Sequence, residues 1–151
     1  FWFRYAALAT VITGLLLAWM NGYIGQALML GGAEGVPQHR NIGIGMWLGL
    51  IMAFNVWFRI WPAQQKIIRA VKNGETPDAN LVKLAGLRSR HNTYMSAPLL
   101  WGMIGQHTTY FAGGNLGIPN DFYWVFLLLI VIVAWHLVFQ LYKRSGKVQG
   151  F

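Results

Sequence analysis

The sequence predicts an all-α fold, an integral membrane four-helix bundle, on three observations. Hydrophobic residues make up 56% of the chain and charged residues only 11%. The apolar residues form four blocks, each long enough to cross a hydrocarbon core of roughly 30 Å. The charged residues stand at the ends of these blocks, as expected where lipid covers the protein surface. This composition excludes a disordered chain and argues against a water-soluble domain.

Residues 1–151 are predicted to form a single transmembrane domain. The first apolar block carries one charged side chain, Arg4, and two amides, Asn21 and Gln26. A glycine-rich turn separates it from the second block, which Pro62 is placed to end because proline lacks a backbone N–H. The predicted spans are about 2–30, 41–61, 92–112 and 122–142.

The polar segment 62–91 begins with helical periodicity, which predicts an amphipathic surface helix that ends at a turn at Asn73 and Gly74. Pro98 lies inside the third span and predicts a kink there. The fourth span is closed by Lys143 and Arg144, two cations of the basic tail.

The distribution of basic residues predicts the orientation of the chain. Basic side chains gather in the segment 62–91 and in the tail, and are nearly missing from the two other connections. Both termini and the segment 62–91 are therefore expected on the cytoplasmic side of a bacterial inner membrane, in contact with membrane lipid. The net charge of +8 follows this topology rather than a nucleic-acid surface, because the cations are not interleaved with aromatic residues on a polar face. The six cations of the segment are Lys66, Arg69, Lys72, Lys83, Arg88 and Arg90.

Histidines are the candidate functional residues. All four carboxylates fall in predicted loops and the chain has no cysteine, which argues against acid–base hydrolysis and excludes disulfides, iron–sulfur clusters and covalent c-type haem. His107 lies about 24 Å along a helix from His91. With the predicted topology, His39 and His107 form an outer pair, and His91 and His136 form an inner pair.

Two pairs of histidines at different depths are what two bis-histidine b-type haems stacked across a bilayer require. His39 and His91 lie near interfaces, where an imidazole can equally be structural. Sixteen residues place His91 and His107 about 160° apart on an ideal helix, so they belong to different interhelical spaces unless Pro98 bends the span. A non-haem copper or zinc site is disfavoured because nothing else at these depths completes a coordination shell.

Two arginines and a set of glycines accompany the histidines. Arg59 near the inner face and Arg40 beside His39 are candidate partners of haem propionates, and snorkelling to lipid phosphate is the alternative for Arg59. The glycines leave room for a flat macrocycle or permit close helix packing, and the sequence leaves both open. They are Gly14, Gly22, Gly25, Gly43, Gly45, Gly49, Gly102 and Gly105.

A resemblance to a known family adds to this interpretation. Residues 52–107 contain Asn55-Val56-Trp57-Phe58, then Pro62 with Gln64, Gln65 and Lys66, a Gly-Glu-x-Pro-Asp turn, and Ser89-Arg90-His91-Asn92-x-Tyr94 followed by Pro98, Met103 and His107. His39, Trp135-His136 and Phe139 fit the same pattern more loosely. The stretch resembles the later half of the membrane domain of the bacterial cytochrome-c-type urate oxidases, or urate hydroxylases.

The resemblance implies a membrane electron-transfer setting, in which a separate c-type cytochrome, a second copy of this chain or other subunits of a redox complex are partners. We expect a haem b-binding electron-transfer subunit of an oxidoreductase complex rather than a self-sufficient enzyme. Two alternatives stay open. One is a cofactor-free accessory subunit of a respiratory or photosynthetic complex, and the other is the membrane part of a purine-oxidising enzyme.

Overall fold

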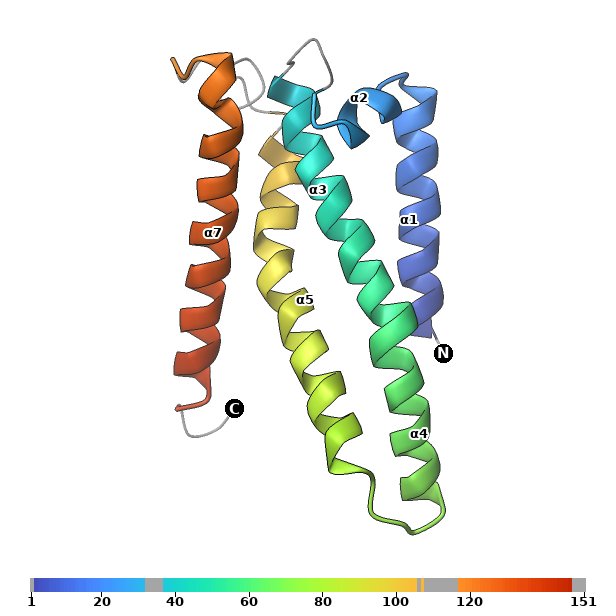
Figure 1. The fold of residues 1–151 in the computed structure, drawn as a ribbon. Helices are drawn as coiled ribbons and strands as arrows, with labels where there is room; N and C mark the ends of the chain where they lie inside the picture. Colours follow the sequence, from blue (N-terminus) through green and yellow to red (C-terminus); the bar gives the residue numbers. More distant parts are fainter. Residues whose placement is uncertain (1, 32–36, 106, 108–116, 148–151) are drawn as a thin grey trace.

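The computed structural model describes residues 2–31, 37–105, 107 and 117–147 (Figure 1). This part of the chain consists of helices and turns and contains no strand, so the predicted all-α class is confirmed. The helices in chain order are α1 (Trp2–Met20), α2 (Ile24–Leu28), α3 (Pro37–Phe54), the π-helix η1 (Asn55–Ile60), α4 (Trp61–Lys72), α5 (Ala79–Gly105) and α7 (Asn120–Ser145).

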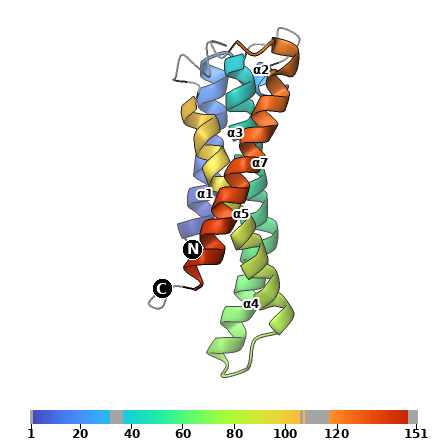
Figure 2. The ribbon, with the colours of Figure 1, turned by 90° about the vertical axis from the view of Figure 1, so that its left-hand side faces the viewer.

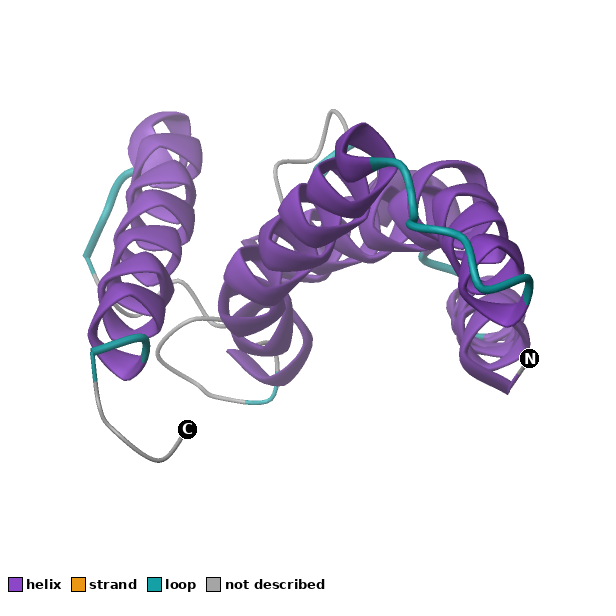
Figure 3. Ribbon diagram, turned by 90° about the horizontal axis from the view of Figure 1, so that it is seen from below, coloured by secondary structure: helices purple, strands orange, loops and turns teal. Residues whose placement is uncertain are grey.

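The helices α3 and α5 form the central pair of the fold. Helix α1 packs on α3 and η1, α7 packs on α5 and more lightly on α3, and the short α2 packs on α3. Seen from below, the described helices follow an open, curved row with α1 and α7 toward opposite ends (Figure 3). Closure of the row into a four-helix bundle stays a prediction.

Three helices are long and apolar enough to cross a membrane: Trp2–Met20, Pro37–Lys72 and Asp121–Ser145. Helix α5 is long but begins at Ala79, well before the third span expected from the sequence, and its first half is rich in polar and charged residues. Together with α4, this half extends beyond the ends of α1 and α7 (Figure 2). The end of the predicted span 92–112 lies outside the described residues, so the crossing by α5 stays a prediction.

The first apolar block is not one helix. The predicted span 2–30 is interrupted after Met20, where Gly22 adopts a left-handed backbone with φ of +75° that favours glycine over any other residue. The carbonyl of Leu17 accepts two hydrogen bonds from Asn21, one from its backbone N–H at 3.0 Å and one from its side chain at 2.8 Å. The remaining apolar residues form α2, which folds back against α3.

Pro62 does not end the second helix, which is a correction to the sequence prediction. Residues Pro37–Lys72 are continuously helical. Proline has no N–H for the carbonyl four residues before it, and the helix widens into the π-helix η1 just ahead of Pro62, where the N–H of Trp61 donates to the carbonyl of Val56. This wider turn accommodates the proline without a break. Helix α5 likewise continues through Pro98.

The predicted amphipathic helix and its turn are confirmed as α4 and the left-handed Gly74, whose φ is +74°. Ala63 of α4 is buried, whereas Lys66 and Arg69 are exposed. The start of α1, the end of α7 and α4 lie toward the same end of the molecule (Figure 1). This agrees with the basic residues gathering on one side, but the direction relative to a membrane stays a prediction.

Candidate functional site

A groove between α1, α3 and α5 has a volume of ≈ 880 Å³. This volume falls in the range of small-molecule and cofactor sites. One face of α3 contributes Gly45 and Gly49, α1 contributes Gly14, α5 contributes Met103, and His107 follows the end of α5. We call this cavity the α1–α3–α5 groove.

One stripe of α5 forms a wall of the groove. Its lining residues recur every three or four positions from Ser89 to His107, as expected for one face of a helix. His91 lies on the other side of α5, with its ring centroid 6.0 Å from that of Trp135 of α7. The arithmetic that assigned His91 and His107 to different interhelical spaces therefore agrees with the structure.

Of the outer pair of histidines, His107 lines the groove, whereas His39 does not. His107 is exposed and lines the groove together with Tyr23, which follows the break after α1. His39, in the first turn of α3, stacks on Tyr23 with ring centroids 5.9 Å apart and an interplanar angle of 18°. The Nδ1 atom of His39 is buried and has no hydrogen-bond partner in the described part of the chain. A buried imidazole nitrogen without a partner is a candidate ligand atom.

The inner pair is not brought to either cavity. His91 is half-buried against Tyr94 and Trp135. His136 is exposed on α7, and its Nε2 lies 3.1 Å from Nε2 of Gln140. Neither histidine lines the groove or the smaller cavity. The ring packing gives His91 a structural role between α5 and α7.

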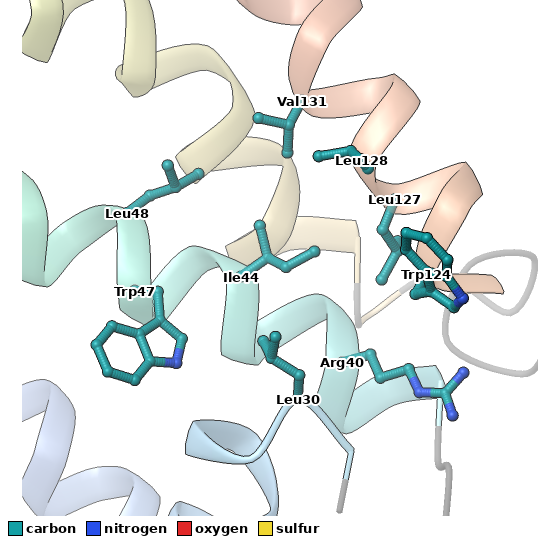
Figure 4. A pocket seen from close by; sticks show the side chains of 9 residues that line it. All are labelled: Leu30, Arg40, Ile44, Trp47, Leu48, Trp124, Leu127, Leu128 and Val131. Carbon is teal, nitrogen blue, oxygen red and sulfur yellow. The ribbon is translucent and has the colours of Figure 1, made fainter.

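The two predicted arginines also lie away from the groove. Arg59 is exposed on η1. Arg40 lines a second, smaller cavity of ≈ 460 Å³ between α3 and α7 (Figure 4). At 100° per residue, Arg40 and Ile44 lie on the side of α3 opposite to Gly45 and Gly49. Arg40 therefore belongs to a different face of the protein from the groove end at His107.

Polar side chains in the groove already have partners within the protein. Asn92 accepts a hydrogen bond from Nδ2 of Asn55 at 2.9 Å and donates one to the carbonyl of Met52 at 3.1 Å. Thr93 and Ser96 donate to carbonyls of their own helix, at 3.2 and 2.7 Å. What the groove offers a ligand is therefore chiefly apolar surface and the imidazole of His107.

The donor set does not suit a bare metal ion. Among the residues with described placement, no three His or acidic side chains gather to hold a metal, whereas structural and catalytic zinc sites take three or four protein ligands. A haem iron needs only one or two axial ligands from the protein.

The glycines divide between the two roles left open by the sequence. A Cβ on Gly14 would meet nothing within 4 Å, and one on Gly49 would meet only Leu99 at 3.6 Å, so both leave room in the groove. A Cβ on Gly102 would lie 3.0 Å from the backbone nitrogen of Gly45, so these two permit close packing of α3 and α5. Tyr23 was not predicted as a site residue, because no sequence pattern near the end of α1 indicates its contact with His39.

The described part of the chain defines an all-helical protein with three helices long and apolar enough to cross a membrane and a groove between α1, α3 and α5. The family model described as urate oxidase N-terminal matches residues 36–149, and the chain belongs to this family. The match covers α3 to α7 and leaves α1, one wall of the groove, outside it. Comparisons with curated proteins and with solved structures gave no match. The resemblance read from residues 52–107 is confirmed at the level of the family.

Proposed function

We propose that the protein is an integral membrane subunit of a redox complex that holds one haem b in the α1–α3–α5 groove. The observation that carries the proposal is a groove of cofactor size that ends at His107, with His39 behind Tyr23 at the same end. Membership of the urate oxidase N-terminal family supports an oxidoreductase setting. A c-type cytochrome or another subunit would then be the electron partner.

The residues of the groove would do three things for such a group. His107 and His39 come from different elements and would supply imidazole ligands at the outer end. Gly49 leaves space on α3, since a Cβ there would meet only Leu99 at 3.6 Å, and a flat ring could approach at this position. The apolar wall of α1 would exclude water. Haem iron bound there would take up and release single electrons.

One haem is proposed rather than two. His91 and His136 were predicted as the inner ligands, but the rings around them are packed together and neither lines a cavity described above. Arg40 faces the other side of α3, so the proposal gives it no role at this haem.

The purine-oxidising alternative is less well supported at this groove. Urate carries several donors and acceptors on its edges, and a specific site must pair them with protein groups. The amide of Asn92 and the hydroxyls of Thr93 and Ser96 already make hydrogen bonds within the protein. An apolar groove ending in an imidazole suits a largely apolar macrocycle better.

A reduced-minus-oxidised visible spectrum of the detergent-purified protein tests the proposal. We expect b-type bands in the wild type, and their loss in His107→Ala and His39→Ala. His91→Ala and His136→Ala serve as matched controls and should retain the bands. Gly14→Leu should also lose them, because its side chain extends into the groove while its Cβ meets no protein atom within 4 Å.

Three results would contradict the proposal. A flat spectrum from folded protein leaves the cofactor-free accessory subunit as the function. Bands that survive in His107→Ala and His39→Ala but disappear in His91→Ala move the haem to the α5–α7 side. If Gly14→Leu leaves the intensity of the bands unchanged, the haem lies outside the groove.

A further inference from the structure

The smaller cavity lies on the face of α3 that the proposed haem site does not use. It runs between α3 and α7, with Arg40 of α3 and Trp124 of α7 toward one end, and Leu48 and Val131 farther along the two helices (Figure 4). Its walls are almost entirely apolar, so Arg40 lines the cavity with its aliphatic stem and its guanidinium lies at the edge, and Leu128 of α7 is 49% exposed (Figure 4).

The dimensions of the cavity match part of a lipid. From Arg40 to Leu48 is about 12 Å along α3, and from Trp124 to Val131 is about 10 Å along α7. Both helices belong to segments long and apolar enough to cross a membrane, and Arg40 stands near the end of its segment. The cavity would therefore extend from the membrane boundary over roughly a third of a 30 Å hydrocarbon core.

We propose that this cavity binds an anionic phospholipid of the surrounding membrane, with the phosphate at Arg40 and an acyl chain along Ile44 and Leu128. A guanidinium has five N–H donors in a fork that suits a phosphate, so an interaction of Arg40 within the protein leaves donors for the head group. Trp124 is 57% exposed and lies beside the cavity toward the Arg40 end, and amphipathic rings of this kind favour the head-group level (Figure 4). The site is independent of the haem and rests only on the helices lying in a membrane.

The preference for an anionic head group is tested with different lipids and with two Arg→Gln variants that remove the same charge. The melting temperature of the detergent-purified full chain is measured with added phosphatidylglycerol, phosphatidylcholine or inorganic phosphate. We expect phosphatidylglycerol to raise it most. In Arg40→Gln the affinity should fall about tenfold or more, because a charge-assisted contact is lost. Arg59→Gln removes the same charge from an exposed position about 28 Å farther along the same helix and should bind as the wild type does.

A second pair of variants tests the apolar wall and leaves Arg40 in place. Leu128→Trp fills the cavity and should abolish the effect of phosphatidylglycerol. Leu129→Trp adds the same bulk to a neighbouring residue that is 53% exposed and does not line the cavity, and should leave the effect intact. Because both substitutions are on exposed positions of α7, the comparison holds even if Arg40→Gln fails to fold.

The proposal is overturned if phosphatidylglycerol and phosphatidylcholine stabilise the protein equally, or if Arg40→Gln and Arg59→Gln bind alike. It is also overturned if inorganic phosphate reproduces the whole shift, which would mean a free-anion site, or if Leu128→Trp retains full binding. The visible spectrum is read separately, so a failure here and a failure of the haem proposal are distinguishable.

Discussion

The contact between α3 and α5 should fail on addition of a single methyl group at Gly102. A Cβ there would lie 3.0 Å from the backbone oxygen of Asn41, 3.0 Å from the backbone nitrogen of Gly45 and 3.1 Å from its Cα. Favourable carbon contacts begin at about 3.5 Å, so the helices must separate by roughly 0.5 Å. All three neighbours are backbone atoms, which no rotamer change can remove. Overpacking of this kind costs about 1–3 kcal/mol.

Gly86→Ala is the matched control for Gly102→Ala. It is the same substitution in the same helix, at a position where the Cβ would meet nothing within 4 Å. Both changes gain about 0.5–1 kcal/mol because alanine loses less backbone entropy than glycine, so this gain cancels in the comparison. We expect Gly102→Ala to be less stable than Gly86→Ala by about 1–3 kcal/mol, or about 2–4 °C in melting temperature for each kcal/mol in a chain of this size. Equal melting temperatures in detergent would refute the close approach of α3 and α5.

Three further predictions concern contacts between helices. Asn92→Ala should lower the free energy of unfolding by about 1–3 kcal/mol, because the buried amide of Asn55 loses the oxygen that accepts its hydrogen bond. In an Asn55→Leu background, thermal unfolding should show a clearly smaller loss for the same change. Trp57→Phe removes a 3.0 Å hydrogen bond to the carbonyl of Arg4, and should raise hydrogen exchange in the first turns of α1 but leave α7 unchanged. Tyr94→Ala should lower the free energy of unfolding by about 3 kcal/mol. Tyr94→Phe keeps the rings in contact and should lie within about 1 kcal/mol of the wild type in the same unfolding assay. A large loss in Tyr94→Phe would show that the hydroxyl, rather than the ring, holds α5 to α7.

The positions of the apolar helices could be read from the sequence because lipid imposes one rule on every span. A chain in hydrocarbon has to satisfy its backbone hydrogen bonds within the segment, so long apolar blocks become helices. The expected fourth span 122–142 corresponds closely to α7, Asn120–Ser145. Asp121, expected in a loop, lies in the first turn of this helix.

The same rule says little about helices outside the apolar blocks. Hydropathy marks where lipid contact begins, but it cannot mark the start of α5 at Ala79, because that half of the helix is stabilised by packing on α4. Nor does it reveal that α3 continues past Pro62, since the π-helix that accommodates this proline is a feature of backbone hydrogen bonding. The break at Gly22 was missed because the residues on both sides of it are equally apolar.

Of the candidate site, the sequence could predict which residues share a helix face but not what lies opposite. Steps of 100° separated His91 from His107 correctly. The stacking of His39 on Tyr23 depends on how α2 folds back on α3, which no local pattern specifies. His107 therefore lines the groove and His39 stacks on Tyr23 of its lining, whereas the inner histidines, equally plausible by depth, do not line it.

The two faces of α3 differ in shape, which supports two separate sites. The side with Gly49 combines this glycine with Ile42, Met46 and Leu50 and opens into the larger groove. The opposite side carries Arg40 and Ile44 and borders the smaller cavity. A bulky residue at Gly49 should therefore reduce haem binding in the groove and leave phospholipid binding unchanged. Leu128→Trp should reduce phospholipid binding and leave haem binding unchanged. If either change altered both readouts, the two cavities would be coupled through α3, and the separate assignment of haem and lipid to its two faces would be wrong.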